Sequence, residues 1–160
     1  MEQESLADKL LQHTVNPTQA GSVADYAPDE IRLACQDLIS RGHDSLAIAV
    51  GEAAYALHPT SQDILSITAL MAITNQDWGL AIERMSELVA IQGVHAQEFT
   101  YIMLARAQRC DLDPAGAIKT LVAGLQVHPT SEALQQELAD LRDYRDAHTA
   151  PATGGEPQLN

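Results

Sequence analysis

The chain has 160 residues, of which 46% are apolar and 19% charged, so it can form one domain with a buried core. Only 4% of the residues are aromatic, which leaves Leu, Ile, Val and Ala to build that core and favours closely packed helices. Acidic residues outnumber basic ones by 22 to 9, for a formal net charge of −13. This balance argues against a nucleic-acid binder or a protein that binds anionic membranes, because both need clustered Lys and Arg.

The compartment is inferred from what the sequence lacks. No apolar run approaches the roughly 20 residues of a membrane-spanning helix, so we expect no membrane insertion. The N-terminal sequence MEQESLADKLLQH is acidic where a secretory signal peptide is basic and then apolar. We therefore expect a cytoplasmic protein in which Cys35 and Cys110 stay reduced and serve as packing residues.

The first predicted helix begins at Ser5, because Ser5-Leu6-Ala7-Asp8 resembles a capping box. Its apolar side is formed by Leu6, Leu10 and Leu11. This helix either caps the domain or pairs with a second copy of the chain. Residues 1–27 are expected to hold the helix and a linker.

An internal repeat fills the middle of the chain. The tetrapeptide HPTS occurs at 58–61 and 128–131, and an Ala-Ile pair recurs at 47–48, 81–82 and 117–118. The pairs are 34 and 36 residues apart, so two extra residues fall between the second and third units, around 93–97. Three units are predicted over residues 28–61, 62–95 and 98–131. A period of this length is typical of helical solenoids.

Each unit is predicted to contain two helices. First helices are expected to begin near Pro28, Ser61 and Gln97, and the third unit's second helix at Asp113-Pro114, a capping Asp followed by a first-turn proline. A further helix over 132–148 carries an apolar stripe typical of a terminal cap, formed by Leu134, Leu138 and Leu141. Residues 149–160 are expected to form a disordered tail. No segment alternates as a strand would, so the predicted class is all-α.

These patterns resemble the tetratricopeptide repeat (TPR) family. The first helices carry its large-x-x-large-small pattern as Ile31-x-x-Ala34-Cys35, Leu65-x-x-Thr68-Ala69 and Tyr101-x-x-Leu104-Ala105. The second helices carry small residues at Ala47, Ala81 and Ala117, whereas Gly51, Leu88 and Gly93 depart from the family pattern. The resemblance implies a right-handed helical-repeat solenoid of three TPR-like helix pairs, with an N-terminal helix and a C-terminal capping helix.

The sequence contains no constellation for catalysis. It has no Gly-rich phosphate loop, no Gly-x-Ser-x-Gly turn and no His-Glu-x-x-His helix. The histidines are isolated, and His58 and His128 are expected to bond the last carbonyls of their helices. We therefore expect no enzymatic activity, no metal site and no cofactor.

The resemblance also implies that the first helices line a concave groove for a protein or peptide partner. Its residues would be Arg32, Gln36, Ile39, Ile67, Leu70, Ile73, Phe99, Ile102, Met103, Arg106 and Arg109. Because this set is largely aliphatic, we expect an apolar peptide segment, extended or helical, as the ligand. Alternatively, the N-terminal helix or tight superhelical curvature covers these residues.

The cationic residues of this set leave two interpretations open. Arg106 and Arg109 could hold an acidic group at one end of the groove, or pair with neighbouring acids such as Asp111 and Asp113. TPR proteins that bind the acidic tails of heat-shock chaperones use a clamp of Lys, Asn, Asn, Lys and Arg. The matching positions here hold Arg32, Gln36, Ile67, Phe99 and Met103, so that activity is not expected.

The predicted function is therefore a protein-interaction module, an adaptor or chaperone for an apolar segment. One alternative is a self-assembling scaffold, such as a homodimer, joined through Leu6, Leu10 and Leu11 or through the apolar helix 62–74. The overall plan is also similar to bacterial type III secretion chaperones that hold hydrophobic translocators, although their aromatic-rich helices are missing here.

Overall fold

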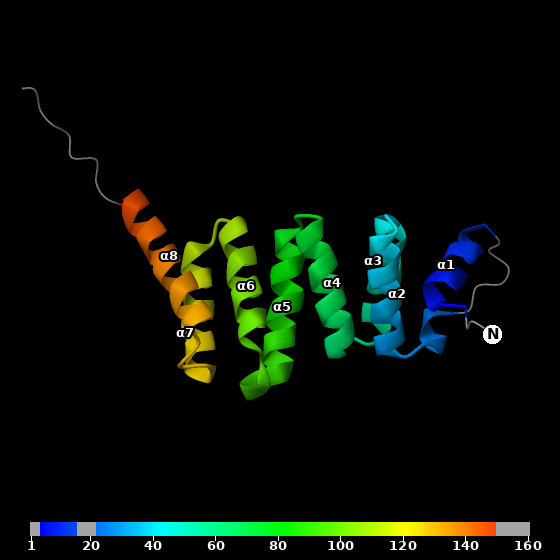
Figure 1. Ribbon diagram of the computed structural model, residues 1–160, viewed down its shortest axis with the longest axis horizontal. Helices are drawn as coiled ribbons and strands as arrows, with labels where there is room; N and C mark the ends of the chain where they lie inside the picture. The colour runs from blue at the N-terminus through cyan, green and yellow to red at the C-terminus, as the bar shows by residue number, and fades with distance from the viewer. Residues whose placement is uncertain (1–3, 16–21, 150–160) are drawn as a thin grey trace, which may run out of the picture.

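The computed structural model describes residues 4–15 and 22–149, which form α-helices arranged side by side in one row (Figure 1). The predicted linker residues 16–21 and tail residues 150–160 lie outside the described residues. The helices are α1 (Leu6–Val15), α2 (Pro28–Ser40), α3 (Asp44–Leu57), α4 (Gln62–Thr74), α5 (Trp78–Gln92), α6 (Glu98–Cys110), α7 (Pro114–Val127) and α8 (Glu132–Thr149). Two 3-10 turns, Val23–Asp25 and Gly93–His95, precede α2 and α6.

The helices pack as consecutive pairs. α2 contacts α3, α4 contacts α5, and α6 contacts α7, while α8 covers α6 and α7 at one end of the row and α1 contacts α2 at the other. The described ranges contain no strand. The all-α solenoid expected from the sequence is confirmed. None of the described helices is both long and apolar enough to cross a membrane.

Capping side chains set the helix starts. The carboxylate of Asp113 accepts a hydrogen bond from the Gly116 amide at 2.8 Å, and the Ser61 hydroxyl accepts one from the Ile64 amide at 3.5 Å. These bonds satisfy amides that have no partner inside the helix. The starts predicted at Ser61 and Asp113 are therefore confirmed.

Small residues lie where the helices cross. Ala47, Ala81 and Ala117 occupy equivalent positions in α3, α5 and α7, and each is 0% exposed. Only a small side chain fits at such close crossings, while large residues pack in the same clusters, Ile31 with Ala47 and Leu121 with Ala117. The apolar stripe of α8 is also buried as predicted, with Leu134, Leu138 and Leu141 at 7% exposure or less.

The core is divided along the row. One large cluster joins α2, α3 and α4, and includes Ile31, Leu38 and Ile64. A second large cluster joins α6, α7 and α8, and includes Leu121 and Leu134. Between them lie two small clusters, Ala69 with Met85 and Leu104, and Ala72 with Ala81 and Ala107. The apolar core is therefore split into separate clusters and does not run continuously along the row.

Helix α1 packs onto the first cluster. Ala7 is buried, and Leu6, Leu10 and Leu11 are partly buried against that cluster. A carboxylate oxygen of Asp8 lies 2.6 Å from a guanidinium nitrogen of Arg41, and this ion pair holds the pKa of Asp8 below its ordinary value. Because α1 lies at the end of the row, it caps the first repeat and leaves the middle helices uncovered (Figure 1).

Candidate binding groove

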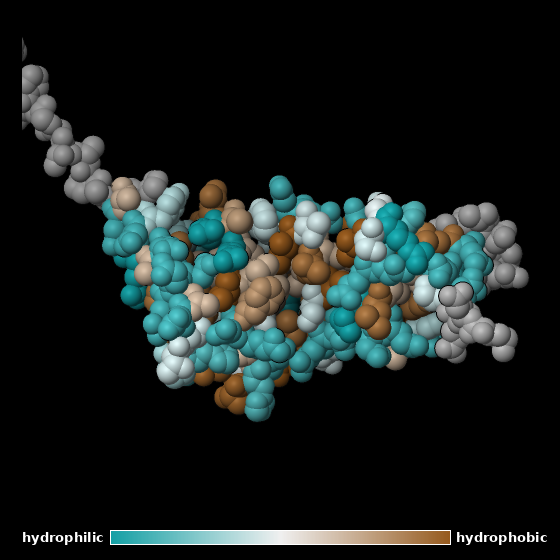
Figure 2. Space-filling model, viewed as in Figure 1, coloured by the Kyte–Doolittle hydropathy of each residue, from teal (hydrophilic) through white to brown (hydrophobic). Residues whose placement is uncertain are grey.

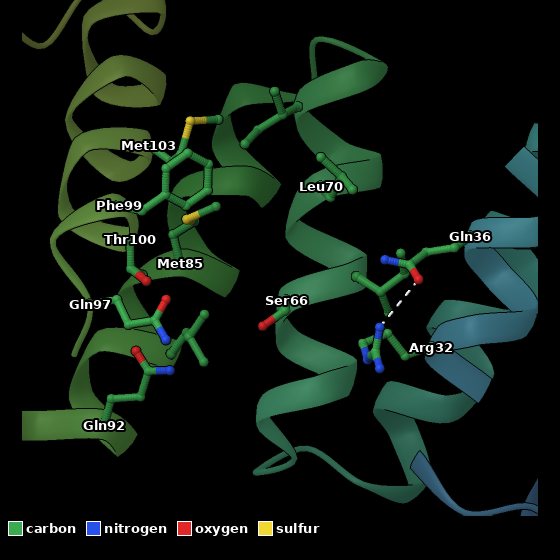
Figure 3. A pocket seen from close by; sticks show the side chains of 13 residues that line it. Arg32, Gln36, Ser66, Leu70, Met85, Gln92, Gln97, Phe99, Thr100 and Met103 are labelled. Carbon is green, nitrogen blue, oxygen red and sulfur yellow. Dashed lines mark hydrogen bonds between the residues drawn. The ribbon is translucent and has the colours of Figure 1, made fainter. Parts of the chain in front are cut away.

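A groove of about 320 Å³ opens at the middle of the row, between α4 and α6, with α5 behind it (Figure 3). Helix α2 contributes to one edge. The lining residues are Arg32, Gln36, Ser66, Ile67, Leu70, Ile73, Met85, Leu88, Gln92, Gln97, Phe99, Thr100 and Met103. Figure 2 shows apolar surface in this central region, with hydrophilic surface towards both ends of the row.

One part of the groove is apolar. Leu70 on α4 and Phe99 on α6 lie on opposite sides of it and are 45% and 61% exposed (Figure 3). Met103 lies beside Phe99, and the buried side chains of Met85 and Leu88 form part of the lining. Exposed large apolar residues that converge on one hollow mark a site where another apolar group can bind.

The other part of the groove is polar but nearly uncharged. Arg32 donates from Nε to a carboxylate oxygen of Asp63 at 2.7 Å and from a second guanidinium nitrogen to Gln36 at 3.2 Å. The amides of Gln92 and Gln97 lie on the α5 and α6 side (Figure 3). Side-chain amides both donate and accept hydrogen bonds, as a peptide main chain does.

The groove coincides with the irregular spacing of the repeat. The helices α2, α4, α6 and α8 begin at residues 28, 62, 98 and 132, so the starts are 34, 36 and 34 residues apart. The two extra residues lie at the junction that contains the 3-10 turn Gly93–His95. Helix α2 packs on α4, and α6 packs on α8, whereas α4 and α6 make at most marginal contact. The insertion therefore falls where neighbouring first helices are separated.

Most of the predicted groove residues line this hollow. They are Arg32, Gln36, Ile67, Leu70, Ile73, Phe99 and Met103. Helix 62–74 is largely buried, as expected from its composition, but Leu70 remains exposed and faces the groove. Covering by the N-terminal helix, considered from the sequence, does not occur among the described residues.

Four predicted residues lie elsewhere. Ile102 is 8% exposed and packs in the second large core cluster, so its side chain is not available to a ligand. Ile39 borders a small separate hollow with Met71. Arg106 and Arg109 lie further along α6, outside the groove lining.

Arg106 and Arg109 do not form the ion pairs with Asp111 and Asp113 that the sequence suggested. Arg106 pairs with Glu137 of α8, which raises the pKa of its guanidinium above its ordinary value. Arg109 is exposed and forms no ion pair with any residue in the described ranges. The contact of Arg106 joins the third repeat to the capping helix instead of closing a groove around an acidic group.

The sequence did not identify the contribution of the second helix of the middle repeat. Met85, Leu88 and Gln92 all come from α5. The sequence-based prediction assigned the groove to the first helices alone. The wide junction between the second and third repeats, however, exposes the second helix α5 behind them. The 36-residue spacing was the available signal for this opening.

The histidine expectation also changes. The side chain of His128 was expected to bond the last carbonyls of its own helix. Instead, its ring nitrogen Nε2 lies 2.6 Å from the carbonyl oxygen of Ala96, in the loop before α6. The ring thereby bridges two repeats. Within the described residues, no three His, Cys, Asp or Glu side chains cluster in a way that could hold a metal ion.

The chain has the tetratricopeptide-repeat fold. Neither a protein-family model nor a curated protein sequence matches it. Among solved structures, it is similar to MamA AMB-1, with a TM-score of 0.67 and 14% identity over 89% of this chain and 81% of that one.

Two further solved structures share the fold. The Sgt2 TPR domain from Aspergillus fumigatus has a TM-score of 0.62 and 19% identity, and the match covers 83% of this chain and 86% of that one. The first TPR of Spaghetti (RPAP3), bound to the HSP90 peptide SRMEEVD, has a TM-score of 0.61 and 14% identity, covering 72% and 90%.

Proposed function

We propose that this protein is a protein-interaction module, an adaptor or chaperone that binds an apolar segment of a partner in the groove between α4 and α6. The observation that carries the proposal is the exposure of Leu70 and Phe99 on opposite sides of one hollow. Single exposed leucines are common on protein surfaces, but two large apolar side chains that face one hollow favour a ligand that buries them.

The expected affinity follows from apolar burial. Each Leu, Ile or Phe side chain that becomes fully buried contributes about 1.5 to 3 kcal/mol before the cost of ordering the ligand. Two or three anchors together contribute about 3 to 9 kcal/mol, and only the part left after the cost of association appears as affinity. Since a dissociation constant of 1 μM corresponds to about 8.2 kcal/mol, we expect micromolar or weaker binding. Such affinities suit an adaptor or chaperone that must also release its partner.

The similar structure of the RPAP3 TPR supports peptide binding as a use of this fold, since that protein is bound to an HSP90 peptide. Its ligand SRMEEVD is acidic. We propose a different ligand class here, because apolar side chains Ile67, Phe99 and Met103 stand at positions where the heat-shock clamp carries polar or cationic ones.

The test begins with co-purification of partners from the native cell and their identification by mass spectrometry. Binding of the identified segment is then measured by calorimetry with the wild type, Leu70→Glu and Phe99→Ala. The matched control is Leu57→Glu, since Leu57 is 49% exposed on α3 and lies outside the groove. We expect at least a tenfold loss for the groove variants and none for the control. Unchanged binding by both groove variants, with circular dichroism showing intact helices, would refute the proposal.

The alternative of self-assembly has less support. Leu6, Leu10 and Leu11 are already packed against the core of the first repeat, so they do not form an open dimer surface. Light scattering of the full chain at high concentration tests this alternative directly. A chaperone for a secreted translocator would be a special case of the proposed function, and the identity of the captured partner would decide it.

A further inference from the structure

The groove is almost free of charge. Among the described residues that line it, Arg32 is the only charged one. The guanidinium of Arg32 lies 2.7 Å from the carboxylate of Asp63, and it also donates to Gln36. An ion pair at this distance cancels most of the field that a lone guanidinium would project into the groove. The remaining lining residues are apolar side chains, amides and hydroxyls.

Asp63 is well placed to hold Arg32. It lies in the first turn of α4, where the helix dipole favours a carboxylate. Its equivalent in the previous repeat is Asp29, in the first turn of α2 and 34 positions earlier. Asp29 does not line the groove and forms no ion pair with any described residue.

The polar lining residues favour an extended ligand. A helical peptide has satisfied most of its own main-chain groups, whereas an extended peptide presents N–H and C=O groups that need partners. The exposed amides of Gln36 and Gln97 can supply such partners at the edges of the apolar hollow.

We propose that the groove selects an extended, uncharged peptide segment carrying a large apolar side chain between Leu70 and Phe99, and that Asp63 determines this specificity by neutralising Arg32. This inference rests on the proposed function and names its ligand class. Acidic segments are rejected because Arg32 is already paired and the chain as a whole carries a net charge of −13.

The test uses a random-peptide library displayed on phage and selected against the full-length protein. The variants are Asp63→Asn, its matched control Asp29→Asn, and the double variant Asp63→Asn with Arg32→Gln. Asp29→Asn removes the same charge at the equivalent helix position, so it reports the effect of net charge alone. The double variant reports whether Arg32 is required. The best wild-type peptide is also made with one Glu beside its apolar anchor, and both forms are measured by fluorescence anisotropy.

We expect the wild type to enrich peptides with a central Leu, Ile, Met or Phe and few acidic residues. Asp63→Asn should bind the Glu-containing peptide about threefold more tightly than the wild type does, which is the scale of a partly exposed ion pair. Asp29→Asn and the double variant should not gain this affinity.

The outcomes separate the inference from the proposed function. Enrichment of acidic peptides by the wild type, or no change on Asp63→Asn, would overturn the inference and leave the proposed function standing. Selection of no peptide in the groove, judged by equal recovery on Leu70→Glu, would overturn both.

Discussion

The guanidinium carbon of Arg84 lies 3.4 Å from the centroid of the Tyr55 ring, so a cation on α5 stacks directly on an aromatic side chain of α3. Arg84 is 4% exposed, and its guanidinium also lies 2.5 Å from Glu83 and 3.4 Å from Glu52. The Tyr55 hydroxyl donates to the carboxylate of Glu87. This cluster joins the second helices of the first two repeats, on elements whose backbones make little contact.

Replacement of Arg84 by Met tests the strength of this cluster. The variant keeps much of the side-chain volume but loses the stacking and both ion pairs, so the free energy of unfolding should fall by about 1 to 2 kcal/mol. Urea denaturation measures the change. The control is Arg109→Met, because Arg109 is exposed and forms no ion pair in the described ranges, so it should change stability by less than about 0.5 kcal/mol. Equal effects of the two substitutions would contradict a structural role for the stack.

Gly124 is predicted to resist substitution although it lies inside α7. A Cβ there would lie 2.9 Å from Cγ and 3.0 Å from Cβ of Tyr101, close to the backbone of α6, where little movement is available. Gly124→Ala should therefore lower the free energy of unfolding by about 1 to 3 kcal/mol, even though Ala is the better helix former.

Gly51→Ala is the natural comparison, since a Cβ at Gly51 meets chiefly the terminal methyl of Met71, which can rotate away. We expect its stability to be unchanged or slightly increased. A similar loss in both variants, measured by thermal unfolding, would argue against the close crossing of α6 and α7 as the cause.

The two thiols are predicted to differ in reactivity. Cys35 is 0% exposed, and burial raises the pKa of its thiol to about 11 from an ordinary 9.0, whereas Cys110 is exposed. A thiol-reactive disulfide should modify Cys110 at once and Cys35 only on unfolding. In the variant Cys110→Ser only Cys35 can react, so rapid labelling of the native variant would contradict the burial of Cys35.

The same burial gives a pH dependence. The unfolded chain releases the Cys35 proton above about pH 9, while the folded chain keeps it until about pH 11. The contribution of this thiol to stability is therefore complete below pH 9 and declines as the pH rises towards 11. The decline should be smaller in Cys35→Ala, compared by denaturant unfolding across this range.

Deletion of Val94 and His95 is predicted to close the groove. The variant has the 34-residue spacing of the other junctions, which should bring α6 towards α4 and let Leu70 pack against Phe99. We expect a higher free energy of unfolding, because more apolar area is buried, and a loss of partner binding of at least tenfold. Substitution of both residues by Ser keeps the length and should preserve binding. A deletion variant that binds its partner normally would show that the 36-residue spacing is not what opens the groove.

The repeat could be predicted from the sequence because it depends on local signals. Helix starts at Ser61 and Asp113 follow from capping chemistry, and the buried Ala47 and Ala117 follow from their recurrence at equivalent positions. These features are set within one or two helical turns, so they are readable without knowledge of the neighbouring repeats.

The groove was less predictable because its lining depends on how repeats are placed against one another. Ile102 shares a helix with Phe99, yet the first is buried and the second is 61% exposed, and only the position of α7 and α8 decides between them. The pairing of Arg106 with Glu137 likewise joins residues 31 positions apart. The opening that brings in Met85 depends on the geometry of a 3-10 turn, which the sequence shows only as two additional residues.

The divided core has a consequence for cooperativity. The core is split into separate clusters, and α4 and α6 make at most marginal direct contact, so the two halves of the repeat array are coupled beneath the groove chiefly through α5. A ligand that contacts both α4 and α6 links them directly, and its binding energy is added to the coupling of the two halves. We therefore expect the bound chain to unfold more cooperatively than the free chain, because the partner links the two halves of the array only while it is bound.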